Sequence, residues 1–117
     1  MRHLLPLPLL AALVLAAAPA AGAAGVKEFA FEIAGGKLVG GRTTVRVVEG
    51  DRVRLRWRAD EAGELHLHGY DLTVRVAPDK VVPMEFRAGI AGRFGIELHG
   101  NRSHHHKNLV YIEVHPQ

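Results

Sequence analysis

The feature that most constrains the fold of this chain is a period of two in its apolar residues, which runs from Val26 onward. The clearest stretch reads RVRLRWR, in which Val53, Leu55 and Trp57 share one side of an extended chain and arginines share the other. Similar short runs recur between Gly, Pro and Asp, and no window carries a helical repeat. About seven or eight strands fit this spacing, which predicts an all-β, two-sheet sandwich.

The alternation also predicts the core. The side chains expected to face inward are Phe29, Phe31, Ile33, Val53, Leu55, Trp57, Val82, Met84, Phe86, Phe94, Ile96, Leu98, Val110, Ile112 and Val114. In the stretch ELHLHGYDL, the even positions continue through Tyr70 and Leu72 to Val76. A single strand through this stretch would turn His66 and His68 toward the core.

The N-terminal residues have the three-part pattern of a secretory signal peptide: a basic start at Arg2, an apolar run, and small residues before a cleavage point. A membrane anchor is the alternative, but prolines interrupt an apolar run that is already short for spanning a bilayer. We therefore expect a signal peptide over residues 1–23 and one domain over residues 24–117. The protein is expected to be periplasmic or secreted, with no membrane span after cleavage.

The sequence contains no cysteine, which excludes disulfide bonds and a copper–thiolate centre. The formal net charge of +3 is too small to indicate a polyanionic partner by itself. A nucleophile beside a base and an oxyanion site is not visible either, because Ser103 is the only serine and falls in a loop. The protein is therefore not expected to be an enzyme.

A row of arginines lies on the polar side of the clearest strand. The row consists of Arg52, Arg54, Arg56 and Arg58. Such a row could follow the phosphates of a nucleic acid, but secretion argues against that interpretation, and no nucleic-acid partner is expected. We interpret the row as a solvated sheet face balanced by acidic residues such as Glu28, Glu32 and Glu49. Attraction to an anionic membrane surface or an acidic partner protein is the alternative.

Two groups of histidines are candidate metal ligands. His66 and His68 are two residues apart, so in a strand their side chains stand about 6.6 Å apart on one face. The second group is His99 with the run that contains His104 and His106. Imidazole nitrogen suits Cu(II) and Zn(II), and Cu(II) is bound more tightly in the usual order. The predicted metal ligands are therefore His66, His68, His99, His104 and His106, with copper as the first choice of ion and zinc as the second.

The histidines also have a structural interpretation. His66 and His68 could donate hydrogen bonds to main-chain carbonyls, and the His-His-His run could be a solvated loop. Strict alternation sends His99 to the side opposite Leu98, so a bulge or a strand end would be needed to bring it to an inward-facing pair.

The order of motifs resembles that of the cupredoxins, and more specifically the EfeO-type cupredoxin-like domains of bacterial periplasmic proteins. The resemblance is carried by FAFEI, VVEGDRVRLRW, HGY, AGRFGIELHG and YIEV, in that order. It implies a Greek-key β-sandwich, and it matches His68 in HGY to the upstream histidine ligand of copper-binding members. Those members place a cysteine where this chain has Leu98, so the resemblance does not imply a type 1 copper centre.

Three functions follow from these observations. The first is an exported domain that binds or delivers a metal ion through histidines. The second is a metal-free interaction module with a periplasmic protein partner. The third is a small metalloenzyme with an open copper site.

Overall fold

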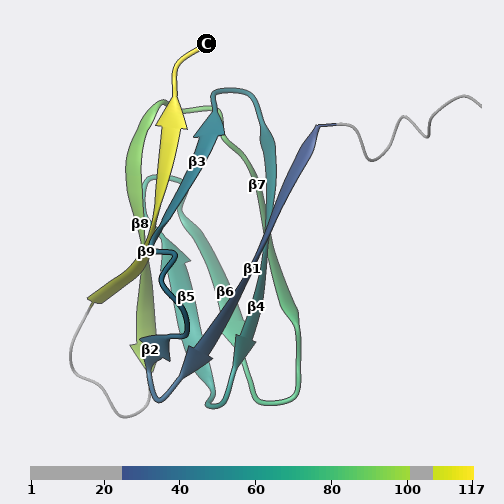
Figure 1. Cartoon of the computed structure of the whole chain (residues 1–117), viewed down its shortest axis with the longest axis vertical. Helices are drawn as coiled ribbons and strands as arrows, with labels where there is room; N and C mark the ends of the chain where they lie inside the picture. Colours follow the sequence, from purple (N-terminus) through teal and green to yellow (C-terminus); the bar gives the residue numbers. More distant parts are fainter. Residues whose placement is uncertain (1–24, 101–106) are drawn as a thin grey trace, which may run out of the picture.

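In the computed structural model, which describes residues 25–100 and 107–117, the chain is all-β and forms two sheets that face each other (Figure 1). The strands are β1 (Val26–Ala34), β2 (Lys37–Leu38), β3 (Thr44–Val48), β4 (Arg52–Ala59), β5 (Gly63–Leu67), β6 (Leu72–Val76), β7 (Val82–Arg87), β8 (Gly92–Gly100) and β9 (Lys107–His115). One sheet has the order β2-β1-β4-β7 and the other the order β3-β9-β8-β5-β6. The predicted sandwich is confirmed.

Both sheets are mixed. Strand β1 runs parallel to β4, and β3 runs parallel to β9, whereas the other neighbours are antiparallel. Parallel neighbours cannot be joined by a tight hairpin, so the chain crosses between the sheets before it returns to each of these pairs. Strands that are distant in the sequence therefore lie side by side. Within the described ranges there is no helix long and apolar enough to cross a membrane.

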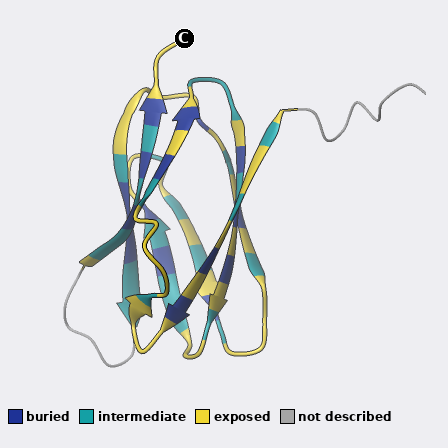
Figure 2. Ribbon diagram, viewed as in Figure 1, coloured by how far each residue is buried: buried dark blue, intermediate teal, exposed yellow. Residues whose placement is uncertain are grey.

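The core lies between the sheets, where buried and exposed residues alternate along the strands (Figure 2). Trp57 of β4 is fully buried, and its ring stacks on Phe31 of β1 with ring centroids 4.9 Å apart. Every apolar residue that the alternation assigned to the core is buried or packs against the buried cluster. The predicted core is confirmed because alternation of this kind is a direct consequence of strand geometry.

The strand that carries the first histidines has the opposite phase from the one expected. Leu65 and Leu67 are the buried residues of β5, with no exposed surface. His66 therefore lies on the outer face, and His68 follows the end of the strand at the surface. The prediction that His66 and His68 turn toward the core is wrong.

A turn that the sequence did not reveal explains the difference. The expected single strand is divided, because β5 ends at Leu67 and β6 begins at Leu72, the residue paired with Leu67. Gly69 and Asp71 between them have positive φ angles of 83° and 50°, which reverse the chain direction. A Cβ on Gly69 would come within 2.3 Å of the Phe94 ring, so glycine is required here. This division, together with β2, makes nine described strands where about seven or eight were expected.

Some expectations fall on residues that the structure does not describe. The signal peptide (1–23), the start of the domain at residue 24, and the histidines His104 and His106 lie outside the described residues. They stay predictions.

Replacing two neighbouring residues of β5 with alanine, one at a time, tests which of them faces the core. Leu67→Ala should lower the free energy of unfolding by about 2–5 kcal/mol, because it leaves a cavity in the core. His66→Ala should change it by no more than about 0.5 kcal/mol, because this side chain lies on the outer face. Urea unfolding followed by tryptophan fluorescence measures both values. A larger loss for His66→Ala than for Leu67→Ala would contradict the phase described here.

Candidate metal site

The candidate site lies on the outer face of the sheet β3-β9-β8-β5-β6, where β5 and β8 run side by side. In β8 the side chains of Ile96 and Leu98 face the core, so Glu97 and His99 face outward. The antiparallel register of β5 and β8 places His66 opposite Glu97. The predicted ligands His66 and His99 therefore meet on one face without the bulge that an inward-facing pair would have needed.

Glu97 is the centre of this group. It is buried, with 9% of its surface exposed. His68 Nε2 donates a hydrogen bond to Glu97 Oε2 at 2.6 Å, and His99 Nε2 lies 3.7 Å from the same oxygen. A buried carboxylate is costly unless polar groups compensate it, and the two imidazoles supply that compensation. The ring nitrogens of His68 and His99 thus converge on one carboxylate oxygen.

His66 completes the cluster beside His68. The two rings meet edge to face, with centroids 4.5 Å apart and an interplanar angle of 75°. His66 Nε2 lies 3.6 Å from Asp71 Oδ1, in the turn that follows β5. Ring nitrogens of the pair thus face carboxylates, which differs from the structural interpretation in which both rings bond to main-chain carbonyls.

Asn108 of β9 borders the cluster from the third strand. The pairing of β8 with β9 is irregular between Ile96 and Glu97, and Glu97 is paired with Asn108. The Asn108 side chain lies over Gly95, where a Cβ would come within 2.3 Å of Asn108 Oδ1. This oxygen is buried and accepts no hydrogen bond from the residues that the structure describes. Gly95 therefore makes room for a buried amide beside the carboxylate.

The donor set fits a divalent metal ion in kind, although it is not assembled around one. Among residues 25–100 and 107–117, no three His, Asp or Glu side chains are arranged as a metal-holding group. Donor atoms about 2.0–2.2 Å from a tetrahedral ion stand about 3.3–3.6 Å apart. The separations from Glu97 Oε2 to the two ring nitrogens, 2.6 and 3.7 Å, lie on either side of that value. Coordination of one ion by all three would need the first separation to widen and the second to shorten.

Glu97 was not among the ligands predicted from the sequence. Those predicted ligands were histidines alone. Glu97 belongs to the site because β8 pairs with β5, which brings Glu97 beside His68. The available signal was an acidic residue at an outward position between two apolar ones, two residues before His99.

Comparison with known proteins supports the fold. No protein-family model matches the chain, and no curated protein matches it in sequence. A chain of a heme-copper terminal oxidase dimer superposes with a TM-score of 0.62 and 19% identity, over 75% of this chain and 64% of that one. A copper binding protein in the apo form superposes with a TM-score of 0.59 and 13% identity, over 77% of this chain and 88% of that one. Copper nitrite reductase from Nitrosomonas europaea superposes with a TM-score of 0.61 and 18% identity, over 79% of this chain and 42% of that one.

The fold is cupredoxin-like. This cupredoxin-like chain spans less than two thirds of the oxidase chain and less than half of the reductase chain. At identities of 13–19% the likeness concerns the fold alone. The narrower resemblance to EfeO-type domains rests on the sequence motifs.

Gly95→Ala tests the packing at the border of the candidate metal site. The added methyl group should collide with Asn108 and lower the free energy of unfolding by about 1–3 kcal/mol. In a double-mutant cycle, Asn108→Ala should remove most of this penalty, because it removes the atoms that the methyl group meets. Urea unfolding of the two single variants and the double variant measures the coupling. An equal penalty with and without Asn108 would show that the two side chains do not compete for space.

Proposed function

We propose that this protein is an exported cupredoxin-like protein that binds a divalent metal ion, copper before zinc, for metal handling rather than electron transfer. The ligands proposed from the described residues are His68, Glu97 and His99, with His66 beside them. The observation that carries the proposal is the buried Glu97 oxygen on which two imidazole nitrogens converge, at 2.6 and 3.7 Å.

The chemistry of the donors supports this choice of ion. Imidazole and carboxylate together suit Cu(II) and Zn(II), and Cu(II) forms the more stable complexes. The proton that His68 shares with Glu97 must leave when a metal binds at Nε2, so binding should release protons and weaken in acid. A thiolate is absent from the whole sequence, so the strong copper–sulfur bond of blue copper proteins cannot form. Binding without that bond favours a role in holding or delivering the ion.

His104 and His106 belong to the proposal as additional ligands. They lie outside the described residues, in the segment between the end of β8 and the start of β9. Both strands contribute to the candidate site, because β8 supplies Glu97 and His99 and β9 supplies Asn108 at its border.

Export is part of the proposal and rests on the signal-peptide pattern at the N-terminus.

A metal-free interaction module is the second candidate function. The observation that favours it is the hydrogen bond between His68 and Glu97, which satisfies both groups without a metal.

Metal content of the purified protein distinguishes the two functions. The untagged protein should be isolated after export, loaded with Cu(II) or Zn(II), dialysed and analysed by mass spectrometry. We expect about one Cu(II) per chain, held more tightly than Zn(II), with no intense blue absorption band. Glu97→Gln and the double variant His68→Ala/His99→Ala should each weaken binding by about tenfold or more, as measured by competition with a chelator.

His115→Ala is the matched control, because His115 is an exposed histidine beside Glu113 at the far end of β9. Its Cu(II) affinity should equal that of the unmodified protein. A His104→Ala/His106→Ala variant measures what the segment outside the described residues adds. Retention of Cu(II) by every variant would reject this site, and failure of the unmodified protein to retain any metal would favour the interaction module.

A further inference from the structure

The outer face of the other sheet carries the arginine row, and its central members are neutralised. Arg54 Nε donates to Glu85 Oε1 of β7 at 2.6 Å. Arg56 pairs with Glu28 of β1, one of the acidic residues expected to balance the row. These ion pairs link β4 to both of its neighbours, and they account for the middle of the row without any partner.

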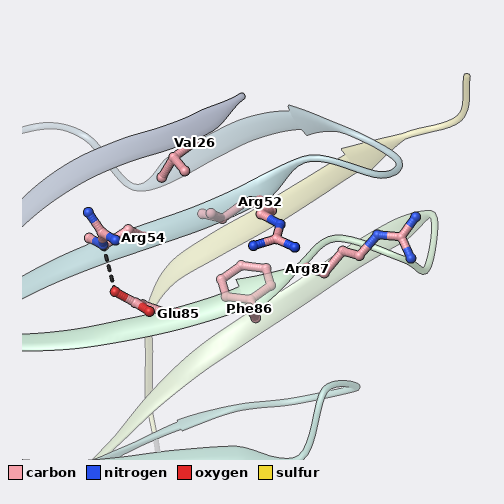
Figure 3. A pocket seen from close by; sticks show the side chains of 7 residues that line it. Val26, Arg52, Arg54, Glu85, Phe86 and Arg87 are labelled. Atoms are coloured by element: carbon pink, nitrogen blue, oxygen red, sulfur yellow. Dashed lines mark hydrogen bonds and ion pairs between the residues drawn. The ribbon is translucent and has the colours of Figure 1, made fainter. Parts of the chain in front are cut away.

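Arg52 and Arg87 break this pattern. The antiparallel register of β4 and β7 places them directly opposite each other, and both are exposed. Like charges in this position destabilise an antiparallel pair. Within the described ranges, neither guanidinium forms an ion pair with an acidic residue. Figure 3 shows the contrast, because Arg54 is joined to Glu85 whereas Arg52 and Arg87 are joined to no residue drawn.

A cleft of about 260 Å³ adjoins the two arginines. Val26 and Phe86 supply apolar surface to its lining, next to Arg52 and Arg87 (Figure 3). The cleft lies on a different sheet from the histidines, so it does not belong to the candidate metal site. Its lining also includes the ion pair of Arg54 and Glu85, so the positive charge that stays without a carboxylate in the cleft is that of Arg52 and Arg87.

We propose that this end of the sheet binds an acidic segment of a partner protein. A carboxylate of the segment bridges Arg52 and Arg87, and a neighbouring apolar side chain packs against Val26 and Phe86. Guanidinium groups recognise carboxylates through paired hydrogen bonds, which supply both orientation and charge complementarity. The bound carboxylate removes the repulsion that the free protein carries.

The glutamates on the same face favour a protein segment over a lipid surface. Glu28, Glu32 and Glu85 project from this face among the arginines. A uniformly anionic membrane would meet these glutamates as well as the arginines, so much of its attraction would be cancelled. A segment with discrete carboxylates can contact the Arg52–Arg87 pair and leave the glutamates in water.

Binding of a fluorescein-labelled octaglutamate peptide tests the proposal. Fluorescence anisotropy should be measured on the exported protein at low salt, with a chelator present so that bound metal plays no part. The unmodified protein should bind saturably, and Arg52→Gln/Arg87→Gln should weaken binding by about fivefold or more. The matched control is Arg75→Gln/Lys80→Gln, which removes the same formal charge from exposed positions elsewhere and should weaken binding less than about twofold.

A second measurement separates a functional pair from a merely exposed one. Arg87→Glu should raise the melting temperature by about 1–4 °C, because it replaces a repulsive cross-strand pair with an attractive one, and it should also abolish peptide binding. A gain in stability with loss of binding would show that the native pair is retained for recognition. Unchanged stability and unchanged binding would overturn the proposal.

Three other outcomes would also overturn it. Equal weakening by the two double variants would show that only net charge matters. Absence of octaglutamate binding by the unmodified protein would reject an acidic segment as the ligand. Binding to phosphatidylglycerol vesicles that depends on Arg52 and Arg87, without binding to the peptide, would identify a lipid surface as the occupant.

Discussion

The burial of Leu65 and Leu67 between the two sheets is the constraint on which the candidate metal site depends. Because side chains alternate along a strand, burying these leucines places His66 on the outer face, and the pairing of β5 with β8 then sets it opposite Glu97. A slip of one residue would expose both leucines, at a cost of about 1.5–3 kcal/mol for each buried side chain lost. The packing of the two leucines therefore positions the polar side chains of the candidate site, although the leucines do not contribute to it chemically.

The fold was predictable from the sequence, because strand alternation is a local property. A half-buried strand is indicated by the alternation of Val53, Leu55 and Trp57 alone, whatever its neighbouring strands are. All three residues are buried, as the pattern predicts. The phase of β5 was not predictable in the same way. The apolar residues change from odd positions (Leu65, Leu67) to even positions (Leu72, Val74, Val76) across the turn at Gly69 and Asp71, and the prediction extended the even positions back through the histidines.

The candidate site was predictable only in part, for a different reason. His66, His68 and His99 were named from residue type, and the structure brings them together on one face. Glu97 could not be recognised as a site residue, because its contact with His68 depends on the pairing of β5 with β8. That pairing cannot be inferred from the sequence of either strand alone. Leu98, where copper-binding cupredoxins place a cysteine, faces the core beside it. The histidine cluster therefore lies on the opposite side of β8 from that position.

The parallel pairing of β3 with β9 joins segments from distant parts of the sequence, with Val45 opposite Ile112 and Val47 opposite Val114. Such a ladder cannot form until both of its strands have been synthesised, and contacts this remote in sequence are slow to form. The sheet that carries the candidate metal site therefore closes late in folding, because β9 joins β3 to β8 within it.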